Sequence, residues 1–205
     1  MSELSPRAAR TRAALIAAGF DLLAVKPIDA ITIDEVVAAA GVAKGSFFNH
    51  FADKHAFAAA IAEDVRRELE HEITCVNAEI ANPVERIANG MRVCAEFAIR
   101  DPKRTAVLLR ASGNVTDRSH PLNRGVSGDF DDAGRQGTIT DQAARTGVVY
   151  WVGLCHALMA NSLDPGMDPP SIRQRTHDMV TLGLTGLGVD QAVAAALASR
   201  CYGRR

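Results

Sequence analysis

The chain has 205 residues, of which 47% are hydrophobic and 23% are charged, and its formal net charge is −1. This composition is ordinary for a globular protein of one or two domains with a proper core, and the near-neutral charge argues against a general polyanion binder. Alanine, leucine and valine dominate, and strand-like alternation is scarce. We therefore expect an all-α fold with about nine or ten helices.

The first helix is expected from about Arg7 to Val25. Pro6 suits the first turn of such a helix. Lys26 precedes Pro27, and the residue before a proline avoids the helical conformation, so the helix ends there. Its apolar positions recur at roughly the helical period: Ala14, Leu15, Ala18, Phe20, Leu22 and Leu23.

Two short helices joined by a tight turn follow between Thr32 and Phe51. Thr32 and Glu35 have the capping-box spacing that starts a helix. Gly41 ends it, because glycine accepts the left-handed backbone of the turn. A second helix is expected from Ala43 to Phe51, with Phe47 and Phe51 on its buried face. A helix, a glycine-containing turn and a second helix make a helix-turn-helix, whose second helix lies in the DNA major groove.

The rest of the chain reads as a series of further helices. Asp53 is expected to cap a long fourth helix, and Thr140 or Asp141 an eighth. The least helical stretch is Ala111–Pro121, and the glycines of the seventh helix lower its helix propensity. The expected elements are the long helix from Asp53 through Ile73, Val84–Ile99, a short helix from Pro102 through Leu109, Leu122–Arg135, about Asp141–Leu163, Ser171 to about Gly188, and Asp190–Ala198.

The stretch from Thr11 to Lys54 resembles the DNA-binding domain of the TetR family of bacterial transcriptional regulators. The residues that carry the resemblance are Thr11-Arg12, the alanines and leucines of Ala17–Leu23, Thr32, Ala40–Val42, Lys44–Ser46 and the His50–Lys54 pattern. The resemblance implies an N-terminal helix-turn-helix domain, residues 1–54, and a helical ligand-binding and dimerisation domain, residues 55–205. It implies a cytoplasmic homodimeric regulator, most often a repressor, that binds a palindromic double-stranded DNA operator and a small-molecule effector.

The resemblance also places DNA contacts on the second helix of the helix-turn-helix. Lys44 is expected to reach guanine or phosphate and Asn49 an adenine edge, while Gly45 lets the backbone approach closely. Ser46 and His50 are expected at phosphates, and Phe48, where the family often has tyrosine, at a thymine methyl. The remaining expected DNA contacts are Lys54, Thr32 and Arg7.

Two further features of residues 1–54 affect the expected binding to DNA. Ala43 replaces the usual serine or threonine, so the second helix lacks a side-chain N-cap, a loss of about 1 kcal/mol. Residues 1–54 contain six basic and six acidic side chains. Because so few phosphate contacts give weak binding to a monomer, we expect a dimer on a two-fold operator.

For the second domain, the resemblance implies an effector pocket among helices four to eight and dimerisation through helices eight and nine. Candidate pocket residues, for which core packing is the alternative, are Met91, Cys94, Phe97, Leu109, Trp151 and His156. Gly183 and Gly186 are interpreted as sites of close helix packing at the dimer interface.

Other functions find less support in the residues. An α-helical enzyme is the rival class. No catalytic residue, cofactor or metal is expected, because the sequence contains no nucleophile-elbow motif, no phosphate-binding loop and no residues at metal-ligand spacing. A helical interaction protein that never binds DNA is a third alternative. No signal peptide or membrane span is expected, since the longest apolar stretch is shorter than the roughly 20 residues a span needs. The four cysteines are interpreted as free thiols, with redox sensing as the alternative.

Overall fold

The computed structural model describes residues 5–111 and 116–203, and every regular element in this part of the chain is helical. The predicted all-α fold is therefore confirmed. The elements are α1 (Pro6–Val25), the 3-10 helix η1 (Ile28–Ala30), α2 (Ile33–Ala40), α3 (Lys44–Phe48), α4 (Lys54–Asn77), α5 (Pro83–Arg100), α6 (Pro102–Ala111), the 3-10 helix η2 (Pro121–Asn123), α7 (Arg124–Arg135), α8 (Asp141–Asn161), α9 (Pro169–Gly186) and α10 (Gln191–Gly203).

The predicted signals at both ends of α2 are present. The Glu35 amide donates to the Thr32 hydroxyl at 3.2 Å, and the Thr32 amide donates to the Glu35 carboxylate at 2.9 Å. These two bonds form the capping box, which satisfies amides that the first helical turn leaves without partners. Gly41 ends the helix with a φ of 66°, a conformation that favours glycine. Both ends of α2 are thus fixed by residues within the helix-turn-helix.

Other helices begin at polar side chains that accept a backbone hydrogen bond. The Asp53 carboxylate accepts from the amides of His55 and Ala56, both at 2.8 Å, as α4 begins. These bonds, that from Ala56 first, lower the pKa of Asp53. Thr140 caps α8 by accepting from the amide of Ala143. The predicted caps of α4 and α8 are therefore confirmed.

The helix α3 is shorter than predicted, because it ends at Phe48 instead of Phe51. Its N-terminus lacks a side-chain cap, as the alanine at position 43 predicts. Past Phe48 the chain keeps turning, since the amides of His50 and Phe51 both donate to the Phe47 carbonyl, at 2.9 and 3.0 Å. The bond from His50 is of the tighter 3-10 kind, so the helix closes into a turn.

Contacts group the chain into two compact units. The N-terminal unit comprises the described residues of 1–66 and 106–113, and the C-terminal unit those of 67–105 and 114–205. The division falls inside α4 and α6, so each of these helices contributes to both units. Within the residues described, no helix is long and apolar enough to cross a membrane.

An aromatic cluster forms the core of the N-terminal unit. The rings of Phe47, Phe51 and Phe57 lie with centroids 4.9 to 5.6 Å apart in edge or tilted arrangements. Phe47 and Phe51 are buried, as predicted. Gly19 of α1 makes room for this cluster, because a Cβ atom there would lie 2.2 Å from Phe57 Cζ. The cluster joins α1, α3 and α4 and fixes which face of α3 remains outside.

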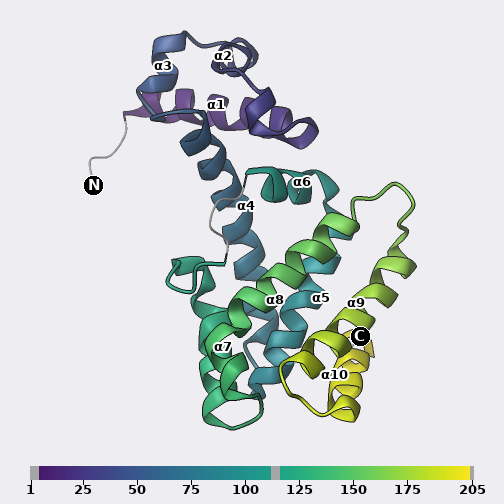
Figure 1. Ribbon diagram of the computed structural model, residues 1–205. Helices are drawn as coiled ribbons and strands as arrows, with labels where there is room; N and C mark the ends of the chain where they lie inside the picture. The colour runs from purple at the N-terminus through teal and green to yellow at the C-terminus, as the bar shows by residue number, and fades with distance from the viewer. Residues whose placement is uncertain (1–4, 112–115, 204–205) are drawn as a thin grey trace. The chain divides into compact units, whose positions relative to one another are not determined.

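The C-terminal unit is built around α5, which contacts α7, α8, α9 and α10 (Figure 1). Glycines permit the closest approach of α7 and α8. A Cβ atom on Gly147 would lie 2.2 Å from the Phe130 ring, and one on Gly134 would lie 2.8 Å from Ala144 Cβ. The predicted helix Leu122–Arg135 is present as η2 followed by α7. Gly134, which lowers its intrinsic propensity, is thus required by packing.

An ion-pair network joins the start of α5 to α7. Arg86 donates to Asp129 at 2.5 Å and to Asp132 at 3.0 Å, and also to the carbonyls of Ile80 and Ala81. Burial raises the pKa of the Asp129 carboxyl, and the hydrogen bond from Arg86 opposes that rise. Because two carboxylates share one guanidinium in a half-buried site, loss of Arg86 would leave both without their partner.

The glycines of α9 pack closely, but against a helix of the same chain. A Cβ atom on Gly183 would lie 2.7 Å from the Trp151 ring, and one on Gly186 would lie 2.7 Å from the Tyr150 hydroxyl. Gly183 is buried within the chain, so its predicted place at a dimer interface is corrected. The glycine spacing allows α9 to lie closely on α8 instead.

Candidate DNA-binding surface and effector core

The short helix α3 is held by one buried side chain, and its other residues remain outside. Phe47 is fully buried, whereas Phe48 is 53% exposed. Lys44, Gly45 and Asn49 are exposed, and Ser46 and His50 are half-buried. Anchoring through Phe47 therefore leaves all six predicted contact positions of this segment at least partly accessible to a partner.

Gly45 has no packing role within the chain. A Cβ atom added there would meet nothing within 4 Å, in contrast to Gly19, where it would clash. Gly45 also has no positive φ that would require glycine. Neither packing among the described residues nor the backbone conformation therefore explains this glycine.

Three of the predicted contact side chains already have partners. The Lys44 ammonium lies 2.8 Å from an Asp34 carboxylate oxygen, and both side chains are largely exposed. Lys54 donates to the carbonyls of Ile28 and Asp29, at 3.3 and 3.2 Å. Thr32 uses its hydroxyl in the capping box. Exposed pairs such as that of Lys44 are weak and exchange readily with a phosphate, whereas Lys54 and Thr32 also hold the local fold.

Arg7, a predicted DNA contact, and Arg12 both lie in the first half of α1. Arg7 is exposed. The Arg12 guanidinium lies 5.5 Å from the centroid of the Phe51 ring, a cation–π contact that ties α1 to the aromatic cluster. In the sequence, Arg12 was noted only as part of the pattern that resembles the family. Its contact with Phe51 depends on where Phe51 packs in the folded domain.

The six predicted effector residues are divided between the two compact units. Leu109 lies on α6 in the N-terminal unit and is half-buried, while the other five belong to the C-terminal unit. Met91, Cys94 and Phe97 lie on the buried face of α5, and Trp151 is buried on α8. His156 is half-buried on the same helix as Trp151.

Trp151 differs from an ordinary core residue in one respect. Its side chain is 2% exposed, and its indole Nε1 has no hydrogen-bond partner within the described residues. Buried donors are almost always paired, so an unpaired one requires an explanation. An acceptor supplied by a bound molecule would satisfy it.

Two buried thiols meet in the same unit. Cys94 of α5 and Cys155 of α8 are both under 10% exposed and remain free thiols. A hydrogen bond with Cys94, followed by burial, raises the pKa of Cys155 well above its ordinary value. Since the thiolate is the reactive form, this environment disfavours reaction of the Cys155 thiol. Cys201 lies outside the described side chains.

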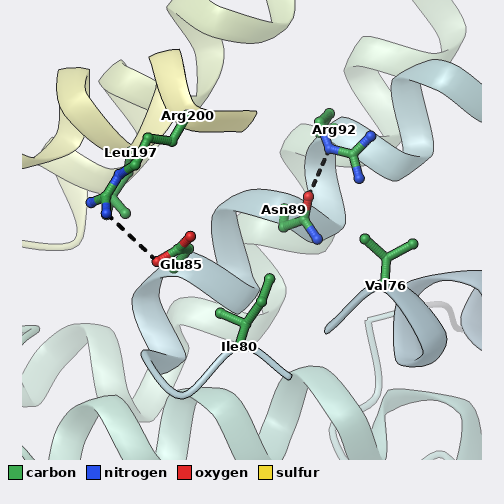
Figure 2. Close-up of a pocket in the computed structure, with 7 residues that line it drawn as sticks. All are labelled: Val76, Ile80, Glu85, Asn89, Arg92, Leu197 and Arg200. Carbon is green, nitrogen blue, oxygen red and sulfur yellow. Dashed lines mark hydrogen bonds and ion pairs between the residues drawn. The ribbon is translucent and has the colours of Figure 1, made fainter. Parts of the chain in front are cut away.

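A separate cavity of about 160 Å³ opens in the C-terminal unit (Figure 2). It contains none of the predicted effector residues. It is lined by Val76, Ile80, Glu85, Asn89, Arg92, Leu197 and Arg200. The sequence interpretation missed these residues, although Glu85, Asn89, Arg92 and Glu96 recur at helical spacing and mark a polar stripe on α5.

The described residues contain no cluster of three or more His, Cys, Asp or Glu side chains that could hold a metal ion.

Solved structures with this fold include several regulators. The structure of RolR in complex with resorcinol aligns with 95% of each chain, at 22% identity and a TM-score of 0.62. The TetR-family protein CprB from S. coelicolor A3(2) aligns with 97% of this chain and 100% of its own, at 22% identity and a TM-score of 0.55. AibR in complex with isovaleryl coenzyme A and operator DNA aligns with 84% of this chain and 97% of its own, at 20% identity and a TM-score of 0.60. At these identities the likeness shows a shared fold.

No curated protein matched the sequence. The sequence itself carries a family signature, because residues 15–61 match the family model described as bacterial regulatory proteins, tetR family. The match runs from the middle of α1 into α4 and covers the whole helix-turn-helix. Residues 15–61 thus carry the TetR-family signature of a helix-turn-helix DNA-binding domain, and the chain shares its overall fold with solved structures of TetR-family proteins.

Proposed function

We propose that the protein is a ligand-responsive transcriptional repressor that binds a palindromic operator as a homodimer. Residues 1–54 would form the DNA-binding domain, and residues 55–205 would bind the effector and the second subunit, with no catalytic activity. The observation that carries the proposal is the set of accessible side chains around the buried anchor Phe47.

The DNA contacts follow from the chemistry of these side chains. Lys44 donates to guanine or phosphate, and the Asn49 amide can pair with an adenine edge. Ser46, His50 and Arg7 reach phosphates, and Phe48 packs on a thymine methyl. Gly45 lets the α3 backbone approach the duplex, because no part of the chain fills the space at its Cα. The AibR structure, with its operator DNA, supports this class of partner.

The homodimer is supported by apolar side chains that α8 and α9 leave in solvent. Val149 and Tyr150 on α8 are 56% and 40% exposed, and Leu182 on α9 is 71% exposed. Because Gly186 has no side chain, the Tyr150 hydroxyl of α8 can lie directly against α9. Burial of such a surface against its symmetric copy would form a four-helix interface.

The effector would bind beside Trp151, whose indole donor lacks an acceptor. Met91, Cys94 and Phe97 of α5 would supply apolar contacts, with His156 of α8 as a further candidate. The ligands of RolR, resorcinol, and of AibR, isovaleryl coenzyme A, both carry oxygen acceptors. An effector with an oxygen acceptor would thus pair with the Trp151 N–H.

Regulation would follow from a shift in population. An effector that binds one conformation more tightly than the other moves the dimer towards that conformation. If the favoured conformation does not place the two α3 helices in successive major grooves, the operator is released.

The test is a gel-shift assay of the full chain on the DNA upstream of its own gene. We expect a shifted band, and we expect Lys44→Ala and Asn49→Ala to weaken binding at least tenfold without changing the melting temperature. Exposed Arg124→Ala, far along the sequence on α7, is the matched control. If no specific shift is found under any condition, the helical interaction protein becomes the better reading.

The dimer has its own test, by sedimentation or light scattering. We expect Leu182→Glu to yield a folded monomer, whereas Val193→Glu, at another exposed apolar position, leaves the dimer intact. A Leu182→Glu protein that remains dimeric would remove the α8–α9 surface from the proposal.

A further inference from the structure

A polar stripe runs along α5 on the helix face that carries Glu85, Asn89, Arg92 and Glu96. Glu85 lies 3.9 Å from Arg200 of α10, and Glu96 accepts two hydrogen bonds from Arg173 of α9, at 2.9 and 3.3 Å. Each carboxylate of the stripe thus has an arginine from another helix. Arg92 is the member with no carboxylate partner among the described residues.

Arg92 is nevertheless held in a defined orientation. Its Nε donates to the Asn89 side-chain oxygen at 2.7 Å, and the Asn89 amide donates to Asn77 at 2.8 Å. Asn77 in turn donates to the carbonyl of Arg86 at 3.2 Å. Asn89 and Asn77 are 6% and 9% exposed, so the relay is buried and anchored to the backbone.

This arrangement leaves the two terminal nitrogens of Arg92 available. Among the described side chains, these two nitrogens form no ion pair or hydrogen bond, and the guanidinium is half-buried beside the cavity. Fixing a long side chain costs conformational entropy, and a guanidinium oriented through Nε alone presents its other donors as a fork. Such a fork matches the two oxygens of a carboxylate.

The cavity itself suits a small acid. Its volume of about 160 Å³ corresponds to about five water molecules. Arg92 and Arg200 contribute two positive charges against the single carboxylate of Glu85, and Val76, Ile80 and Leu197 supply apolar walls. Figure 2 shows Arg92 and Val76 on one side of Asn89 and Arg200 and Leu197 on the other.

We propose that this cavity binds a small organic monocarboxylate, with its carboxylate on the terminal nitrogens of Arg92 and its apolar part against Val76, Ile80 and Leu197. Arg200 adds positive potential while it remains paired with Glu85. The site joins α5 to the end of α4 and to α10, and it is distinct from the core beside Trp151. It thus goes beyond the proposed effector site and does not depend on DNA binding.

The test uses calorimetry on the full chain with benzoate, its neutral analogue benzamide, and inorganic phosphate. We expect benzoate to bind with one site per chain, and benzamide to bind at least tenfold more weakly, because it lacks the charge. Tighter binding of phosphate than of benzoate would overturn the proposal, since phosphate makes no use of the apolar walls.

Substitutions of the residues that line the cavity test where benzoate binds and which charges favour its binding. We expect Arg92→Gln to weaken benzoate binding at least tenfold, Arg92→Lys to weaken it less, and Glu85→Gln to strengthen it severalfold by removing the negative charge. Arg124→Gln on α7 is the matched control and leaves the affinity unchanged. Benzoate affinity that survives Arg92→Gln overturns the proposal, as does the absence of benzoate binding to the wild-type chain.

One further variant separates this site from the proposed effector core. We expect Trp151→Phe to retain benzoate binding, because Trp151 does not line the cavity. Loss of benzoate binding in Trp151→Phe with normal binding in Arg92→Gln would place the acid in the core and overturn the assignment. Failure of operator binding, by contrast, would count against the proposed function alone.

Discussion

The guanidinium of Arg110 donates a hydrogen bond to the backbone carbonyl of Leu23 at 3.0 Å, and a second bond reaches the carbonyl of Ala24. The end of α6 therefore caps the last turn of α1, where helical carbonyls lack intrahelical donors. The contact lies within the N-terminal unit. The second half of α6 therefore packs with the N-terminal unit. The sequence interpretation placed the whole of α6 in the second domain.

Arg110→Ala is expected to destabilise the N-terminal unit by about 1 kcal/mol, because two carbonyls lose a charged donor near solvent. Hydrogen exchange of the α1 amides measures this locally, and we expect faster exchange at the end of α1. Arg145→Ala, an exposed arginine on α8, serves as control. Equal exchange in both variants would show that the cap contributes no stability.

Gly45→Ala separates folding from DNA binding. Alanine favours a helix over glycine by about 0.5–1 kcal/mol, and the added methyl meets no atom of the chain, so the melting temperature is expected to stay or rise. Operator affinity is expected to fall at least tenfold, because the methyl stands between α3 and the duplex. Thermal unfolding measures the melting temperature, and a gel shift on the same sample measures the operator affinity. An unchanged affinity would show that Gly45 does not lie at the DNA interface.

Gly19→Ala is expected to weaken the N-terminal unit by about 1–3 kcal/mol, the usual cost of overpacking. The new Cβ atom would lie 2.2 Å from Phe57 Cζ and 2.7 Å from the end of Ile61, so the aromatic cluster must move. Chemical denaturation measures the loss. Gly125→Ala on α7, where nothing lies within 4 Å, is the matched control and should be neutral or slightly stabilising.

Glu35 makes the stability of α2 sensitive to acid. Hydrogen bonds, that from Lys26 first and then those from Thr32, lower the pKa of Glu35 from 4.5 to about 2. A depressed pKa means that the native state favours the ionised carboxylate, so this stabilisation is complete above about pH 4.5 and is lost as pH falls towards 2. We expect Glu35→Gln to lower the melting temperature at pH 7 by a few degrees and to change it little at pH 2. A constant difference at every pH would contradict the role of the ionised carboxylate.

The cysteines are expected to differ in reactivity. Cys75 is exposed, whereas Cys94 and Cys155 are buried and the pKa of Cys155 is raised. In the folded protein at pH 7.5, iodoacetamide is expected to modify Cys75 at least tenfold faster than Cys155, as mass spectrometry of tryptic peptides would show. Unfolding in urea should remove the difference. Fast oxidation of the Cys94–Cys155 pair by peroxide would instead support the alternative that these cysteines sense redox state.

Local signals allowed the sequence alone to predict the helix-turn-helix. The box formed by Thr32 and Glu35 and the turn at Gly41 involve atoms within a few residues of one another, so their effect does not depend on the rest of the fold. The burial of Phe47 follows from its spacing with Phe51 on one helical face. Only the end of α3 was placed wrongly, because the tight turn at His50 depends on how Phe51 enters the aromatic cluster.

Partners distant in sequence could not be predicted in this way. From the sequence alone, Gly19 would only be expected to weaken its helix, and Gly183 was interpreted as an interface glycine. The structure shows that Gly19 packs against Phe57 and that Gly183 packs against Trp151. In both cases the glycine is required by the side chain it meets, and composition carries no information about that side chain.

The sequence by itself determined the helix starts capped by Thr32, Asp53 and Thr140 and the helix-turn-helix, because capping and helical periodicity are interactions between near neighbours. Only the tertiary structure decided that Cys94 meets Cys155 and that, among the described residues, neither the Trp151 donor nor the Arg92 guanidinium at the cavity has an acceptor of the expected kind: a hydrogen-bond partner for Trp151 and a carboxylate for Arg92. These features arise when separate helices pack, and packing depends on the shapes of all the surfaces that meet.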